Sequence, residues 1–208
     1  LIETLRQPME EGSITVSRLN QTVVFPAKTM IAAAMNPCKC GFFPDLGRCR
    51  CTPTQIRRYL NRVSGPFLDR IDIGVEVPRQ DLGMMAAEKS IDEGSFPQTE
   101  QRNSSAVMRA RVMEARVRQE KRFADESISY NSQMTRRQIE EYCRLSGEDA
   151  VFLEKVERQQ GISARGHGKI LKVARTLADL DGQAEIGRTQ LAEAIGFRSF
   201  EKKYWGSL

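Results

Sequence analysis

Residues 29–35 read TMIAAAM, and Asn36-Pro37 follows them directly. The run is short, continuous and apolar, which indicates a buried strand of a parallel sheet rather than a helix. Residues 71–77, IDIGVEV, alternate apolar side chains with others and predict a second strand. These two segments indicate an α/β fold for the N-terminal part of the chain.

A hairpin and a helix are also expected in this part. Residues 14–17 alternate in the β manner and residues 23–25 are β-branched and aromatic, with a polar tip between them that begins at Arg18. This pattern predicts a β-hairpin. Residues 53–63 place apolar side chains at helical spacing, and Thr52 is suited to cap that helix.

The chain beyond residue 100 has a wholly helical pattern. A polar stretch with glycine and proline, residues 79–100, is predicted to link an N-terminal domain (1–78) to a helical domain (101–208). Helices are predicted at about 102–123, 135–146, 148–160, 163–181 and 188–196. The expected order is therefore α/β followed by all-α.

Composition limits the class of protein. The 208 residues are 40% hydrophobic and 28% charged, as in globular proteins, and the longest near-apolar run is far shorter than the roughly 20 residues of a membrane span. No secretory leader is visible. The net charge of +5 permits nucleic acid, nucleotide or acidic protein as partners. Because the first residues already read as the middle of a helix, we expect a fragment of a longer protein.

Four cysteines form a candidate metal site. They follow the spacing C-x-C-x8-C-x-C around a loop that contains glycine, whereas Cys143 stands alone. Four thiolates suit a tetrahedral zinc ion and leave no open coordination position, so the predicted role is structural. Buried reduced thiols and disulfides are the alternatives. The four predicted ligands are Cys38, Cys40, Cys49 and Cys51.

Two polar residues lie next to the predicted strands. Asn36 would stand at the carboxyl edge of the sheet, where ligands bind in open α/β folds, or it could simply be a turn residue before proline. Arg70 lies at the start of the second strand, where its planar guanidinium could reach the nucleotide of a neighbouring molecule. A local ion pair with Asp69 or Asp72 is the alternative.

The helical part offers fewer candidates. Arg165 lies in a first helical turn, where a cation opposes the helix dipole. His167, the only histidine, has no partner at a catalytic spacing and is interpreted as a surface residue. Residues 102–122 carry seven basic and two acidic residues, an excess of +5. A solvated helix face is favoured over a phosphate-binding face.

These features together resemble one family. The segments LRQPMEEGSITVSR, AAMNPCKCG, CRCTPTQIRRYLNRVSGPFLDRIDIGVEVPR, ISAR, KILKVARTLADLDG and LAEAIGFRS are similar to the C-terminal part of the ComM/YifB family of bacterial magnesium-chelatase-like AAA+ ATPases. The resemblance implies the second half of an AAA+ αβα core with a pre-sensor 1 hairpin and a C-terminal helical lid. It also implies a cytoplasmic hexamer that uses ATP and Mg²⁺ for DNA branch migration during natural transformation.

The resemblance also implies residue roles. Asn36 matches the sensor 1 position, Arg70 the arginine finger acting on a neighbouring subunit's ATP, and Arg165 the sensor 2 arginine of the lid. Arg18 matches a basic hairpin residue that contacts DNA. The chain contains neither a Walker A motif nor Walker B, so we expect it to be inactive alone. A zinc-stabilised nucleic-acid-binding module without ATPase chemistry, or a protein-remodelling chelatase-like subunit, are the alternative functions.

Overall fold

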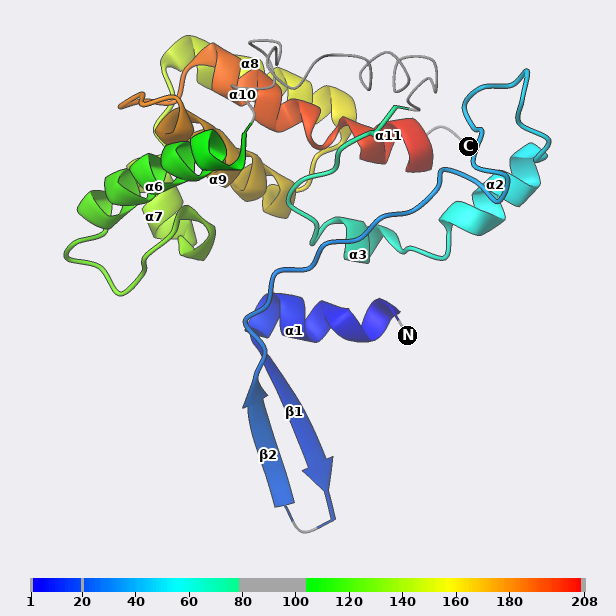
Figure 1. Cartoon of the computed structure of the whole chain (residues 1–208), viewed down its shortest axis with the longest axis horizontal. Coiled ribbons are helices and arrows are strands. Elements are labelled where there is room, and N and C mark those ends of the chain that lie inside the picture. Colours follow the sequence, from blue (N-terminus) through cyan, green and yellow to red (C-terminus); the bar gives the residue numbers. More distant parts are fainter. Residues whose placement is uncertain (1, 20, 79–103, 207–208) are drawn as a thin grey trace, which may run out of the picture. The chain divides into compact units, whose positions relative to one another are not determined.

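The computed structural model describes residues 2–19, 21–78 and 104–206 (Figure 1). Its residues cluster into two compact units. The first consists of Leu1–Gly74 together with Arg198–Leu208, and the second of Val75–Phe197. The C-terminal residues from Arg198 onward therefore pack with the N-terminal unit, which the sequence did not indicate. The predicted linker, residues 79–100, lies outside the described residues.

The first unit begins with a short helix and a hairpin. A 3-10 turn, η1 (Ile2–Leu5), leads into α1 (Arg6–Glu11), which ends at Gly12 with a φ of 62°. Glycine suits this left-handed conformation because it has no Cβ. The strands β1 (Ser13–Arg18) and β2 (Gln21–Pro26) then pair in antiparallel register. The predicted hairpin is thus present, while its assignment as a pre-sensor 1 hairpin stays a prediction.

The predicted strands over 29–35 and 71–77 are wrong for this structure. Both segments lack regular secondary structure, and the hairpin is the only sheet in the described residues. Their apolar side chains are largely exposed, with Met30 at 94% and Val77 at 85%. A strand needs a neighbour to satisfy its N–H and C=O groups, and the described residues provide none for these segments. The described part of the chain is therefore mostly helical.

Three short helices complete the first unit. Thr52 caps α2 (Pro53–Leu60), as the sequence predicted, and forms a capping box with Gln55; the helix ends three residues before the predicted end. The helix α3 (Gly65–Leu68) follows, and the side chain of Ser64 caps it. The last helix, α11 (Ser199–Trp205), was not predicted.

The second unit is a helical bundle whose core surrounds one long helix. Ala174 and Ala178 on that helix are fully buried, and Leu191 and Leu153 from two neighbouring helices are 0% and 1% exposed. All five helices predicted from the sequence are present, with their ends displaced by a few residues. No helix in the described ranges is both long and apolar enough to cross a membrane. The elements are α6 (Ser105–Arg122), η2 (Asn131–Gln133), α7 (Arg136–Tyr142), α8 (Gly147–Gln160), α9 (Ala164–Leu180) and α10 (Arg188–Gly196).

Candidate functional site

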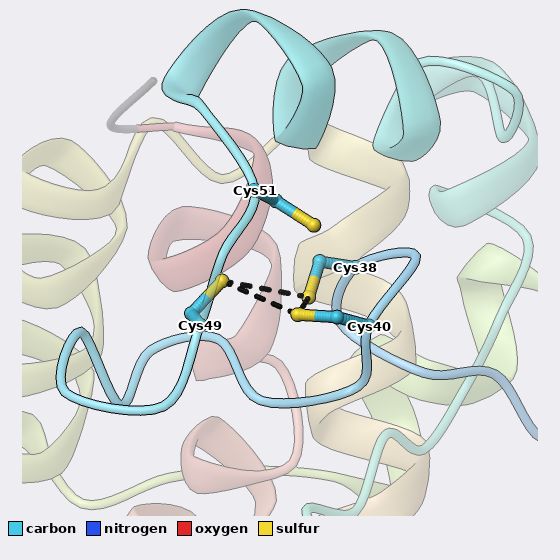
Figure 2. A group of neighbouring side chains, drawn as sticks. All are labelled: Cys38, Cys40, Cys49 and Cys51. Atoms are coloured by element: carbon cyan, nitrogen blue, oxygen red, sulfur yellow. Dashed lines mark hydrogen bonds between the residues drawn. The ribbon is translucent and has the colours of Figure 1, made fainter.

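The four predicted metal-binding cysteines converge in space (Figure 2). The Sγ atom of Cys38 lies 3.3 Å from that of Cys40 and 3.8 Å from that of Cys49. The Sγ atoms of Cys40 and Cys49 are 3.6 Å apart, and all four sulfurs, including that of Cys51, lie within 4.8 Å of one another. Two chain segments that are separated by the loop of residues 41–48 thus present four thiols to one point.

Backbone turns in this loop fix the positions of the thiols. Gly41 adopts a φ of 78°, and its N–H donates to the carbonyl oxygen of Cys38. The carbonyl oxygen of Asp45 accepts from the N–H of Cys49 at 2.8 Å, and its carboxylate accepts from the N–H of Gly47. These bonds close the loop, so that both cysteine pairs face inward.

The four sulfurs influence one another's ionisation. The backbone N–H of Phe42 is the main factor that lowers the pKa of Cys40 to about 6, because it stabilises the thiolate. The backbone N–H of Cys51 lowers the pKa of Cys49. Burial and the neighbouring Cys40 and Cys38 sulfurs outweigh that effect and raise the pKa of Cys49 to about 12. A second negative charge is therefore unfavourable among these sulfurs when no cation is bound.

The donor set fits a tetrahedral zinc ion. With Zn–S bonds of about 2.3 Å, the sulfurs of a tetrahedral site lie about 3.8 Å apart. The three separations among the sulfurs of Cys38, Cys40 and Cys49, 3.3 to 3.8 Å, are close to that value. All five cysteines are free thiols, so the disulfide alternative finds no support among the described residues. Zinc held by four thiolates would stabilise the loop and activate no water.

The C-terminal helix packs against the cysteine cluster. Tyr204 and Trp205 of α11 lie against the cluster formed by Cys38, Ile56 and Leu60. The indole N–H of Trp205 donates to the carbonyl oxygen of Leu60 at 3.1 Å. Sequence reasoning missed these residues, although the aromatic spacing of FEKKYW in residues 200–205 is a signal that could have found them.

Arg70 lies directly after α3 rather than at the start of a strand. Its side chain is 9% exposed, and its guanidinium forms an ion pair of 2.6 Å with Glu10 of α1. It also donates to the carbonyl oxygen of Pro66. Arg70 therefore forms an ion pair, and Glu10 of α1 is one of its partners.

A second arginine, Arg198, binds the residues on both sides of Arg70. It is 4% exposed, and it donates to the carbonyl oxygen of Ile71 at 2.8 Å. Its guanidinium also lies 3.7 Å from the carboxylate of Asp69 and donates to Glu201. Arg198 therefore joins the start of α11 to the segment that carries Arg70. Sequence reasoning missed it because two of its partners, Asp69 and Ile71, are more than 120 positions away.

The other predicted site residues lie at separate places. Asn36 is exposed and lies beside Gly41 in the first turn of the cysteine loop. A Cβ atom added to Gly41 would lie 3.7 Å from the Asn36 side chain. Arg18 is exposed at the end of β1 and pairs with Gln21 across the hairpin. In the second unit, Arg165 is exposed in the first turn of α9, which Ser163 caps.

Comparison with known proteins identifies the family. Residues 1–85 match a family model described as magnesium chelatase, subunit ChlI, and residues 102–198 match the model of the ChlI C-terminal region. Over 200 residues the chain is 40% identical to the competence protein ComM of Haemophilus influenzae, covering 96% of this chain and 36% of that relative. The chain belongs to the magnesium-chelatase-like ComM/YifB family.

Other relatives support the same assignment. The uncharacterized protein YifB of Escherichia coli K12 is 39% identical over 201 residues, which cover 97% of this chain and 37% of that relative. YifB of Salmonella typhimurium is 37% identical over the same number of residues. The chain thus spans little more than a third of the length of these ComM/YifB relatives.

The basic helix of this ComM/YifB chain uses several of its arginines inside the second unit. Arg122 of α6 binds the carboxylate of Asp179, which is 0% exposed, and also donates to Asn131 at 2.9 Å. Arg118 donates to the carbonyl oxygen of Asp179, and Arg111 lies 3.8 Å from the carboxylate of Asp181. These contacts favour a structural role for this helix over a phosphate-binding face.

His167 also has a local partner. Its Nδ1 atom lies 2.6 Å from a carboxylate oxygen of Glu157 on α8, and its side chain is 45% exposed. This contact joins the first turn of α9 to α8. It agrees with the interpretation of His167 as a surface residue rather than a catalytic one.

Proposed function

We propose that this chain is part of a hexameric AAA+ ATPase that couples ATP hydrolysis to DNA remodelling, specifically branch migration during natural transformation. The observation that carries the proposal is the 40% identity to a competence protein over 96% of the chain. The two magnesium chelatase matches support the AAA+ part of it, with ATP and Mg²⁺ as the substrate and its metal.

Arg70 is proposed to act on the ATP of a neighbouring subunit. Hydrolysis develops negative charge on the transferring phosphoryl group, and an arginine supplied in trans stabilises that charge. In this chain the guanidinium is held by Glu10 and by the carbonyl oxygen of Pro66. Contact with a phosphate therefore requires Arg70 to exchange the Glu10 carboxylate for phosphate oxygens.

Asn36 and Arg165 are proposed to act on the subunit's own nucleotide. Asn36 would position the attacking water or a phosphate oxygen through its side-chain amide. Arg165 lies in the first turn of α9, so its charge would reach nucleotide from the helical lid. Arg18 at the end of the hairpin would contact DNA in the central channel.

The cysteine cluster is proposed to hold a structural zinc ion. Cys38, Cys40, Cys49 and Cys51 would supply all four ligands and leave no position for a substrate. The metal would then stabilise the loop against which α11 packs. This role requires no part in ATP hydrolysis.

ATPase measurements on the complete protein, with and without branched DNA, test the proposal. Arg70→Ala and Arg165→Ala should each reduce hydrolysis by orders of magnitude, on the order of 10³ or more for a trans arginine. Arg136→Ala is the matched control because that side chain is 94% exposed on α7, and it should leave hydrolysis unchanged.

Mixing separates the two roles. Arg70→Ala subunits mixed with subunits whose phosphate-binding loop is disabled should recover activity, because the intact arginine of one serves the intact site of the other. The same mixture with Arg165→Ala should stay inactive. The reverse pattern would contradict both assignments. Hydrolysis that does not respond to DNA would favour a protein-remodelling subunit instead.

A further inference from the structure

The loop with the four cysteines and the helix after it carry a concentrated positive charge. Residues 38–63 contain six basic residues and one acidic residue, Asp45, an excess of 6 − 1 = +5 that equals the net charge of the whole chain. All six basic side chains are exposed. We call this region the cysteine-loop surface; its cations are Lys39, Arg48, Arg50, Arg57, Arg58 and Arg62.

These cations differ from those of the basic helix α6, which carries six basic and two acidic residues. There, Arg122 and Arg118 bind Asp179, and Arg111 lies near Asp181. On the cysteine-loop surface, none of the six cations has an ion pair or a side-chain hydrogen bond within the described residues. Only cation–π contacts are present, from Arg48 to Phe42 and from Arg62 to Tyr59. The charge of this surface is therefore available to a partner.

Part of this charge would balance a bound metal. Four thiolates and one Zn²⁺ ion together carry a charge of −2, and Lys39, Arg48 and Arg50 are next to cysteines in the sequence. Arg57, Arg58 and Arg62 lie on or just after α2, whose buried residues Ile56 and Leu60 face the cluster. The charge of these three arginines is not needed to balance the charge of the metal site.

We propose that the cysteine-loop surface binds the phosphodiester backbone of nucleic acid, with Arg57, Arg58 and Arg62 as the contacting residues. Five of its six cations are arginines, whose planar forks match phosphate oxygens in geometry. A membrane surface fits less well, since a helix lying on lipid exposes an apolar face and that of α2 is buried. The proposal adds a second DNA contact to Arg18 and does not depend on ATP hydrolysis.

Binding measurements on the complete protein without ATP test this proposal. The probes are a labelled oligodeoxythymidine and a labelled duplex, each titrated over a range of salt concentrations. The double variant Arg57→Ala/Arg58→Ala should reduce the salt slope by about 1.5 and weaken binding roughly 30-fold near 0.1 M salt, as expected for two lost phosphate contacts. The two probes show whether single strands or duplex are preferred.

The matched control is Arg136→Ala/Arg137→Ala, an adjacent pair of exposed arginines on α7. It removes the same net charge and should leave the salt slope unchanged. The charge-keeping variant Arg57→Lys/Arg58→Lys should retain most of the slope. Equal losses in the α7 control, or no loss in the α2 variant, would overturn the proposal.

Two further probes test whether the cysteine-loop surface binds a membrane or an acidic protein instead. Vesicles containing phosphatidylserine that bind with the same dependence on Arg57 and Arg58 would reassign the surface to membranes. Polyglutamate that competes as well as DNA would reassign it to acidic protein. Because the assay needs no nucleotide, its result stands even if the protein proves not to be an ATPase.

Discussion

The buried Asp179 network offers a quantitative test of how the basic helix is used. The carboxylate of Asp179 is 0% exposed and accepts two bonds from Arg122 and one, at 2.8 Å, from Asn131. Arg175, one turn earlier on α9 and 3% exposed, lies 3.2 Å from it. Asp179→Asn would remove the negative charge and turn an amide N–H toward these guanidinium donors.

The size of the effect follows from these contacts. Removing one partner of a buried ion pair costs about 3–5 kcal/mol, because the remaining charge stays buried without compensation. Here two arginines would be left in that state, so we expect the free energy of unfolding to fall by about 3–5 kcal/mol. That is a large part of the roughly 5–15 kcal/mol that stabilises a typical domain.

Urea unfolding followed by circular dichroism measures this loss. The matched control is Asp181→Asn, one residue past the end of the same helix, where the side chain is 42% exposed and Arg111 lies 3.8 Å away. Its loss should stay below about 1 kcal/mol, in the range of surface ion pairs. A loss below 1 kcal/mol for Asp179→Asn as well would refute the structural role that we assign to Arg122.

Two further predictions concern buried groups outside the metal site. Arg198→Ala should lower the free energy of unfolding by about 2 kcal/mol, because it removes charged hydrogen bonds to Ile71 and Glu201. It should also increase hydrogen exchange in residues 65–74, measured by mass spectrometry. Unchanged exchange in these residues would contradict the link between Arg198 and the segment that carries Arg70. Burial raises the pKa of Cys143 from 9.0 to about 11. Its contribution to stability should therefore be complete below pH 9 and disappear as the pH rises toward 11. Alkylation at pH 8 should label Cys143 only after unfolding, and rapid labelling of the folded protein would disprove its burial.

The features that local sequence predicts well are those that depend on neighbouring residues. Apolar periodicity and capping residues predict helices such as α9, which Ser163 caps. The paired spacing of the four cysteines likewise predicted their convergence, because the loop between them is short. In both cases the interacting groups are close in the chain.

What the sequence could not predict depends on distant partners. The segment of residues 29–35 has a strand-like composition, but a strand also requires a neighbour, which a single pattern does not reveal. One partner of Arg70, Glu10, is 60 positions away, and Arg198 reaches Ile71 across 127 positions. A short sequence window around Arg70 contains Asp69 and Asp72 but not Glu10, so it could not reveal the contact with Glu10.

The metal content of the protein, purified without chelator, tests the account of the cysteine cluster most directly. Elemental analysis should give close to one zinc per chain, and Cys143→Ser should keep it, since that thiol lies in the other unit. Cys38→Ser should lose the metal and lower the melting temperature. A metal-free protein whose four clustered thiols titrate freely, with unchanged stability, would contradict the zinc site.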